Sequence, residues 1–300
     1  MSGWILFAGF AALCNGVKSC TDKKALEKNT SFEILAWFSL MAFIMVMFVC
    51  EDAFDTELKW ILVALLKAFI MIAAGVANFY ALNRIDVGLH SVLSLFGVIS
   101  TIVLSTILLG EKVTLPILSG SALVLIGLFI LNVDFEKLKH RRNNKEKIEN
   151  EKVPYIPILF IIFACICYSI TGIIDKKVLV HITTSQLQFW LFYFFALGNW
   201  VILILKRIRD KKKVFEVFTL STLRNNYWIL LSSLCFAIAD KCYYIASGIP
   251  DSKVMIMSLI SKFSVIVTLV LSKIMFNEKH VVKEFFCSLL IILGIVITTL

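Results

Sequence analysis

The chain has 300 residues, of which 59% are hydrophobic and 17% are charged. Soluble domains average roughly 45–50% apolar and about 25% charged residues, so the composition excludes an ordinary soluble protein and indicates an integral membrane protein. The net charge of +9 is explained by basic loops beside anionic lipid, and we expect a lipid bilayer, not nucleic acid, as the partner of those charges.

Ten apolar stretches follow one another along the chain, each near the length of about 20 residues that a helix needs to cross a bilayer. Only helices and closed barrels satisfy their backbone in lipid, and the alternation typical of a barrel strand is absent. We therefore predict an all-α integral membrane protein with ten transmembrane helices, over residues 3–20, 33–50, 58–82, 86–109, 113–133, 154–174, 186–205, 226–249, 252–276 and 280–300.

One polar stretch, Asp134–Lys152, interrupts this pattern with the sequence DFEKLKHRRNNKEKIENEK. A charge run without apolar periodicity is typical of a solvated linker. The predicted organisation is a first five-helix repeat over 1–133, a basic polar linker over 134–153 and a second five-helix repeat over 154–300.

The eight cysteines lie in or at the ends of the apolar stretches. We interpret them as packing residues, because free cysteine is a small side chain that is usually buried. Cys165 and Cys167 would lie about 200° apart on a helix and could not share a metal. No metal or cofactor is expected. The first basic residue is Lys18, so the basic start of a signal peptide is missing and the first stretch is expected to be a true span.

An internal duplication determines the expected architecture. The segment Ser91–Lys112 returns as Ser258–Lys279, 167 residues later, with 12 of 22 positions identical and no gap. At an offset of 153, the run Asp22-Lys23-Lys24 matches Asp175-Lys176-Lys177. Because each repeat holds five helices, an odd number, the second must be inverted relative to the first, as in secondary transporters with a binding site near the midplane.

Lysine and arginine predict the orientation. The loops after the odd-numbered spans, with the linker, carry 21 of these residues, whereas the opposite side carries five. The positive-inside rule therefore places the basic linker and the loop 206–224 in the cytoplasm and both termini outside a cell membrane.

The repeated segments resemble the drug/metabolite transporter superfamily, and most closely its EamA-like transporters. The residues that carry the resemblance are Gly110-Glu111 and Asn277-Glu278 at the ends of the fourth helices, and Gly120, Gly127 and Gly294 in the fifth. The resemblance implies a ten-helix basket with a substrate cavity between the repeats. This chain departs from the family in having Gly97-Val98 and Ser264-Val265 where relatives often carry a proline.

Ionisable residues at membrane depth are the first candidates for a substrate or coupling site. Asp240 and Lys262 lie 11 residues on either side of Asp251, so both are expected about 16 Å deep and at matched depth in the hairpin of spans eight and nine. Lys241 is the third candidate. The alternatives are a structural ion pair and lysines that snorkel to the interface, and Lys67 is assigned to snorkelling.

Polar and aromatic residues within the spans are candidates for lining a pocket: Asn15, Asn78, Trp37 and Trp190. Interhelical hydrogen bonding and aromatic packing are the competing interpretations. The two Asp-Lys-Lys runs are interpreted as solvated helix ends, with a gate that pairs across the repeats as the alternative.

We predict a secondary active transporter that moves a small polar metabolite by alternating access. Two bases and one acid near the midplane favour an anionic solute, and Asp240 could couple transport to protons. The alternative is a non-transporting scaffold or subunit of a transport complex; a homodimer is kept open. An enzyme is not expected, because the sequence lacks clustered carboxylates, a nucleophile elbow and a phosphate loop.

Overall fold

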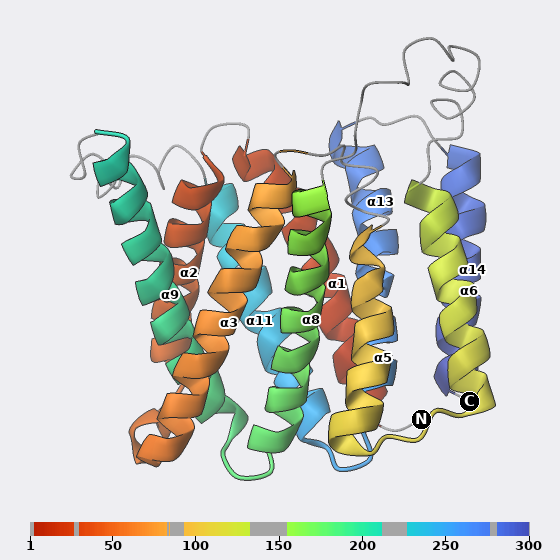
Figure 1. Ribbon diagram of the computed structural model, residues 1–300, viewed down its shortest axis with the longest axis horizontal. Helices are drawn as coiled ribbons and strands as arrows, with labels where there is room; N and C mark the ends of the chain where they lie inside the picture. Colours follow the sequence, from red (N-terminus) through yellow and green to blue (C-terminus); the bar gives the residue numbers. More distant parts are fainter. Residues whose placement is uncertain are drawn as a thin grey trace. The chain divides into compact units, whose positions relative to one another are not determined.

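The structure is a computed structural model that describes residues 3–26, 30–82, 84, 93–132, 155–211, 227–276 and 281–299. The predicted linker over 134–153 and most of the loop 206–224 lie outside the described residues. The described helices are α1 (Gly3–Leu26), α2 (Ser31–Met47), α3 (Leu58–Leu82), α5 (Phe96–Leu109), α6 (Leu115–Asn132), α8 (Tyr155–Val178), α9 (Thr184–Arg209), α11 (Trp228–Gly248), α12 (Val254–Ile260), α13 (Phe263–Phe276) and α14 (Val281–Thr299), with a short 3-10 turn, η1 (Ala53–Asp55) (Figure 1).

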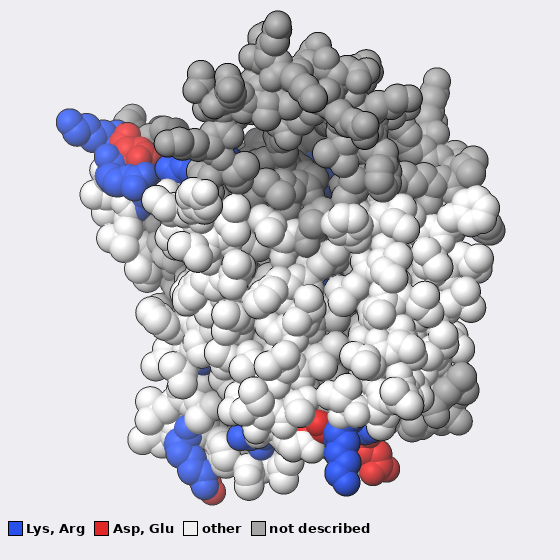
Figure 2. Space-filling view, turned by 45° about the vertical axis from the view of Figure 1, so that its right-hand side comes forward, with Lys and Arg blue, Asp and Glu red and all other residues white. Residues whose placement is uncertain are grey.

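The helices agree with the predicted all-α membrane architecture. In the described part of the chain, six helical segments are long and apolar enough to cross a membrane, one of them combining α12 and α13, and four more are shorter apolar helices. Figure 2 shows a face whose middle carries uncharged side chains, with lysine, arginine and acidic residues gathered toward its ends. The prediction of ten spans is thereby confirmed.

The fold divides into two compact units. The larger contains residues 1–72 and 171–279, and the smaller contains 73–170 and 280–300. Within the larger unit, α1 packs along both α11 and α13, while α2 packs along α9 and α11. Helix α11 is the eighth span and α13 is part of the ninth, so both of these spans pack on the first span, α1. The sequence analysis expected spans eight and nine to form a hairpin and did not predict that both contact α1.

A threonine contact recurs once in each unit and supports the duplication. In the larger unit, Thr268 of α13 donates a hydrogen bond of 3.3 Å to the Gly16 carbonyl of α1. In the smaller unit, the Thr101 hydroxyl of α5 lies 2.8 Å from that of Ser169 in α8. Thr101 corresponds to Thr268 and Gly16 to Ser169 at the two repeat offsets. Each fourth helix therefore contacts the first helix of the other repeat at the same place.

Helix starts are duplicated as well. Thr30 before α2 and Thr183 before α9 both form capping boxes, with Glu33 and Gln186 as their third helical residues. Such boxes satisfy amide groups that a helix start leaves without partners. Thr30 and Glu33 correspond to Thr183 and Gln186 at the offset of 153, so one local signal sets the start of the second helix in both repeats.

The fourth helix of each repeat contains a tightened turn, which the sequence analysis did not predict. In the second repeat, the turn at Ser261-Lys262 separates α12 from α13, and Ser261 donates a 2.6 Å hydrogen bond to the Ser258 carbonyl. In the first, a turn at Leu95 precedes α5. Leu95 corresponds to Lys262 at the offset of 167. The span expected over 252–276 therefore runs as one helical segment from Val254 to Ser272, but its centre is tightened, because the Lys262 and Val265 amides bond carbonyls three residues back rather than four.

The smaller unit is held by close backbone packing of α6 on α14. A methyl group built on Gly120 would lie 2.5 Å from the Gly294 carbonyl oxygen, and one built on Gly294 would lie 2.6 Å from that of Gly120. Small residues allow such an approach between membrane helices. The glycines that carry the family resemblance thus have a packing role.

Candidate functional site

A buried ion pair joins the two repeats inside the larger unit. The Lys67 ammonium of α3 contacts the Asp175 carboxylate of α8, and the two residues are 2% and 3% exposed. Lys67 was expected to snorkel and Asp175 to lie at a solvated helix end. Both expectations were wrong, because α8 continues to Val178 and carries Asp175 into the packed interior.

A tyrosine extends this pair to the predicted candidate Asp240. The Lys67 ammonium donates a hydrogen bond of 3.0 Å to the Tyr244 hydroxyl. That hydroxyl in turn donates to Oδ2 of Asp240, one turn earlier on α11, at 3.2 Å. Lys67, Asp175, Tyr244 and Asp240 therefore form one chain of contacts, which we call the buried ionic cluster.

The cluster contains more acidic groups than basic groups. Its members are two carboxyl groups, one ammonium and one phenol, and Lys67 and Asp175 also act electrostatically on Asp240. Lys67 lies nine residues into α3 and Asp240 eight residues before the end of α11, so each is about 12–14 Å from its helix end. A second carboxyl at this depth needs a proton, a cation or a polar solute to balance it.

Helix packing brings these residues together from both repeats. Lys67 comes from the third helix of the first repeat, and the other three come from the first and third helices of the second. The sequence analysis selected Asp240 but did not select Lys67, Asp175 or Tyr244 for the site, and it kept Asp175 only as part of an alternative, a gate that pairs across the repeats. The signal that could have found Asp175 was its duplication with Asp22 within a helical pattern, whereas a tyrosine in an apolar stretch gives no such signal.

The other two predicted site residues lie elsewhere in the larger unit. Lys241 of α11 donates a 2.6 Å hydrogen bond to the Ser185 hydroxyl at the start of α9. Lys262 occupies the tightened turn between α12 and α13, and its side chain is half-buried. A substrate role for these two lysines stays a prediction.

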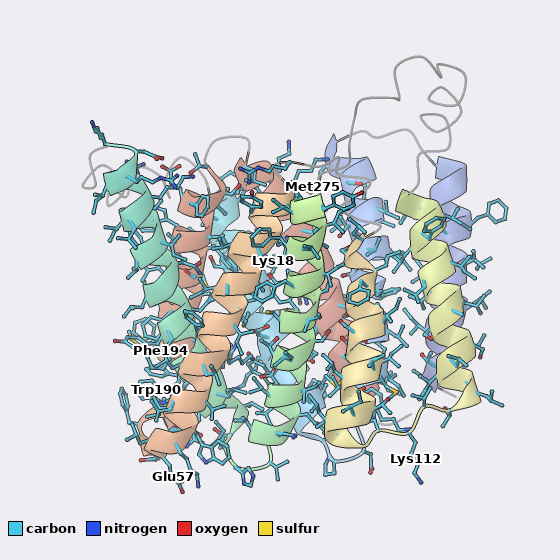
Figure 3. All side chains as sticks on the ribbon, viewed as in Figure 1. Lys18, Glu57, Lys112, Trp190, Phe194 and Met275 are labelled. Carbon is cyan, nitrogen blue, oxygen red and sulfur yellow. The ribbon has the colours of Figure 1, made fainter. Side chains whose placement is uncertain are left out.

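The predicted pocket-lining residues show their own environments. Trp190 donates a 2.9 Å hydrogen bond to the Ala53 carbonyl in η1, in the part of α9 labelled in Figure 3. Trp37 is buried edge-on against Trp200, with ring centres 5.3 Å apart. Asn15 and Asn78 are half-buried on α1 and α3. These contacts fit the alternative of aromatic packing for the tryptophans, and pocket lining stays a prediction for all four residues.

An open groove of about 430 Å³ lies in the smaller unit. Its lining is entirely apolar: Leu93, Leu95, Phe96, Ile99, Leu125, Ile126 and Phe129. Such a lining offers no hydrogen bond to a polar solute. The buried ionic cluster is therefore the better candidate for a site that handles polar or charged species.

The fold and the cluster together define a class: a multi-pass helical membrane protein of two five-helix repeats with ionisable groups buried between helices of both repeats. A model of the EamA-like transporter family matches residues 2–133 and again 155–300. The chain belongs to the EamA-like transporter family, as the repeats predicted. This membership implies a transporter-type function in a membrane.

Two similar proteins agree with this assignment. An uncharacterised protein of Methanocaldococcus jannaschii is 24% identical over 131 residues, which are 43% of this chain and 96% of that protein. The relative is thus about the size of one repeat. A crystal structure covers 100% of this chain and 97% of its own, with a TM-score of 0.75 and 13% identity. That likeness shows the fold alone.

Proposed function

We propose that this protein is a secondary active transporter that moves a small polar metabolite across the cell membrane by alternating access. The buried ionic cluster carries the proposal, because it places charge deep within spanning helices of both repeats. A scaffold has no need of such a group, since charge in a membrane interior is costly to maintain. A non-transporting subunit remains the competing function.

An anionic solute fits the lysines near the centre of the second repeat. Lys262 lies at the tightened turn of the fourth helix, where the equivalent first-repeat position is Leu95. The turn is therefore compatible with an apolar residue, and the positive charge is an addition at one of two equivalent places. An ionisable residue within a spanning segment is a candidate for contact with a charged solute. We propose that Lys262 contacts a carboxylate or phosphate of the solute.

Ligand-induced stabilisation of the purified protein tests this proposal. A panel of amino acids, sugars and phosphorylated compounds, sorted by charge, should raise the unfolding temperature where a solute binds, by RT ln(1 + [L]/Kd) in free energy. We expect anionic compounds to stabilise the wild type and Lys262→Met to abolish the shift. Stabilisation by neutral or cationic compounds alone would contradict the anionic solute. A panel without response, with Asp240→Asn and Lys262→Met also leaving function intact, would favour the scaffold.

Proton coupling through Asp240 is proposed for the same cluster. In the described part of the chain, the Asp240 carboxyl accepts a hydrogen bond from a tyrosine and not from a lysine. Asp240→Asn removes this carboxyl. In proteoliposomes we expect the variant to lose concentrative uptake driven by a pH gradient and to retain exchange of a stabilising solute. Glu57→Gln, at an exposed ion pair with Lys59, is the matched control. Wild-type uptake that persists after the pH gradient has been collapsed would overturn the coupling.

The orientation remains part of the proposal. The basic linker and the loop 206–224 face the cytoplasm and both termini face outward, on the strength of the lysine and arginine distribution.

A further inference from the structure

Asp22 and Asp175 are equivalent residues that each reach across to the other repeat. Asp22 of α1 accepts a hydrogen bond from the Ser232 hydroxyl of α11, and it pairs with Lys18 at 2.6 Å. Asp175 of α8 pairs with Lys67 of α3. In both cases the first helix of one repeat is bonded to the third helix of the other. The duplicated Asp-Lys-Lys run thus has a duplicated structural consequence.

The two contacts lie toward opposite ends of the larger unit. Both contacts involve helix α11, so their separation can be measured along it. Ser232, near the start of α11, bonds Asp22, and Tyr244, near the end of α11, bonds Lys67 of the Asp175 pair. Twelve residues of helix separate them, which is about 18 Å along the axis. Figure 3 places Lys18, the lysine that pairs with Asp22, in the upper half of the view.

The two aspartates differ in how far their side chains are exposed. The Asp22 side chain is 30% exposed, whereas that of Asp175 is 4% exposed. In an inverted repeat, the alternate state exchanges the conformations of the two halves. If the helices pack less tightly at one end of the protein than at the other, Asp22 and Asp175 are expected to differ in exposure, as they do.

We propose that Asp22 and Asp175 are a matched pair of gates, each of which holds one end of the transporter closed and is released while the other holds. The inference rests on the proposed alternating access. Each gate is a hydrogen-bonded contact to a carboxyl group, and losing one is expected to shift a two-state equilibrium by roughly tenfold. Breaking the Asp22 contact opens one side of the membrane, and breaking the Asp175 contact opens the other.

Cys14 is a native reporter for this test. It is half-buried on α1 and lies within electrostatic range of Cys235 and Cys242 on α11. Both of these cysteines fall between Ser232 and Tyr244 along α11, so Cys14 lies between the two gates. A membrane-impermeant thiol reagent added to one face of reconstituted vesicles, and then to the other, measures access from each side, with the modified Cys14 peptide quantified by mass spectrometry.

We expect Asp22→Asn to raise the rate of Cys14 labelling from one side by roughly tenfold, and Asp175→Asn to raise it from the opposite side by a similar factor. A purely structural role predicts equal changes from both sides or none, and either of those results overturns the proposal. Glu57→Gln serves again as the exposed control.

Milder variants keep the test decisive if an aspartate variant does not fold. Ser232→Ala removes the donor to Asp22, and Tyr244→Phe removes the acceptor that Lys67 uses beside Asp175. The two variants should raise the rate of Cys14 labelling from opposite sides of the membrane, by smaller factors than the aspartate variants. Shifts to the same side would overturn the gates while leaving solute uptake intact. Wild-type vesicles without uptake, but with opposite labelling shifts, would instead contradict the proposed function alone.

Discussion

Replacing Lys67 with methionine should destabilise the protein by about 3–5 kcal/mol, the range for removing one partner of a buried ion pair. The substitution keeps the apolar volume of the side chain but leaves the Asp175 carboxylate, 3% exposed, without its cation. It also leaves the Tyr244 hydroxyl without its donor. The free energy of unfolding, measured by denaturant titration of the purified protein in detergent micelles, should report the loss.

Two further variants separate a buried charge from lost packing. Lys59→Met breaks the exposed pair with Glu57 and should change stability by about 0–1 kcal/mol, as exposed pairs do. The double variant Lys67→Met with Asp175→Leu removes both charges, and replacing a buried pair by apolar residues is often neutral. It should therefore be more stable than Lys67→Met alone. If the double variant were as unstable as Lys67→Met, the two side chains would stabilise the protein through their packing and not through their charges.

The ion pair could be predicted only in part from the sequence. The duplicated aspartates could be recognised because they are identical letters at a fixed offset. Their partners could not, because the equivalent of Lys67 in the second repeat is Leu234, so the repeat offers no pattern for the lysine. Which helices pack against each other decides the pairing, and hydropathy contains no information about neighbours.

The tightened turn of the fourth helix is a different kind of omission. Neither Leu95 nor Ser261-Lys262 is a proline or glycine, the residues that usually signal a distortion of a helix. The sequence did contain a weaker sign, since Ser94 and Ser261 are identical positions of the duplication. Serine can bond to its own helix without distorting it much, so the pattern alone did not distinguish a tightened span from a regular one. The ten spans, by contrast, followed from length and hydropathy, and their inverted repetition followed from the duplicated segments and the odd number of helices in each repeat.

Replacing Gly120 with valine should have the second large effect, by forcing α6 and α14 apart. The first carbon added at Gly120 would lie 2.5 Å from the Gly294 carbonyl oxygen and 3.0 Å from the Thr298 amide nitrogen. Both are backbone atoms that cannot rotate away. Overpacking of this kind typically costs about 1–3 kcal/mol, and occasionally more. We expect the loss in the same detergent titration.

A matched glycine separates this packing effect from backbone flexibility. Gly9 also lies inside a helix, and a carbon added there would meet nothing within 4 Å. Gly9→Ala should leave stability unchanged or raise it by up to about 1 kcal/mol, because alanine favours helix over glycine. Gly294→Val should reproduce the Gly120→Val loss, since the methyl built on Gly294 meets the Gly120 carbonyl oxygen at 2.6 Å. If Gly120→Val were as stable as Gly9→Ala, α6 and α14 could not be packed as closely as their two glycines indicate.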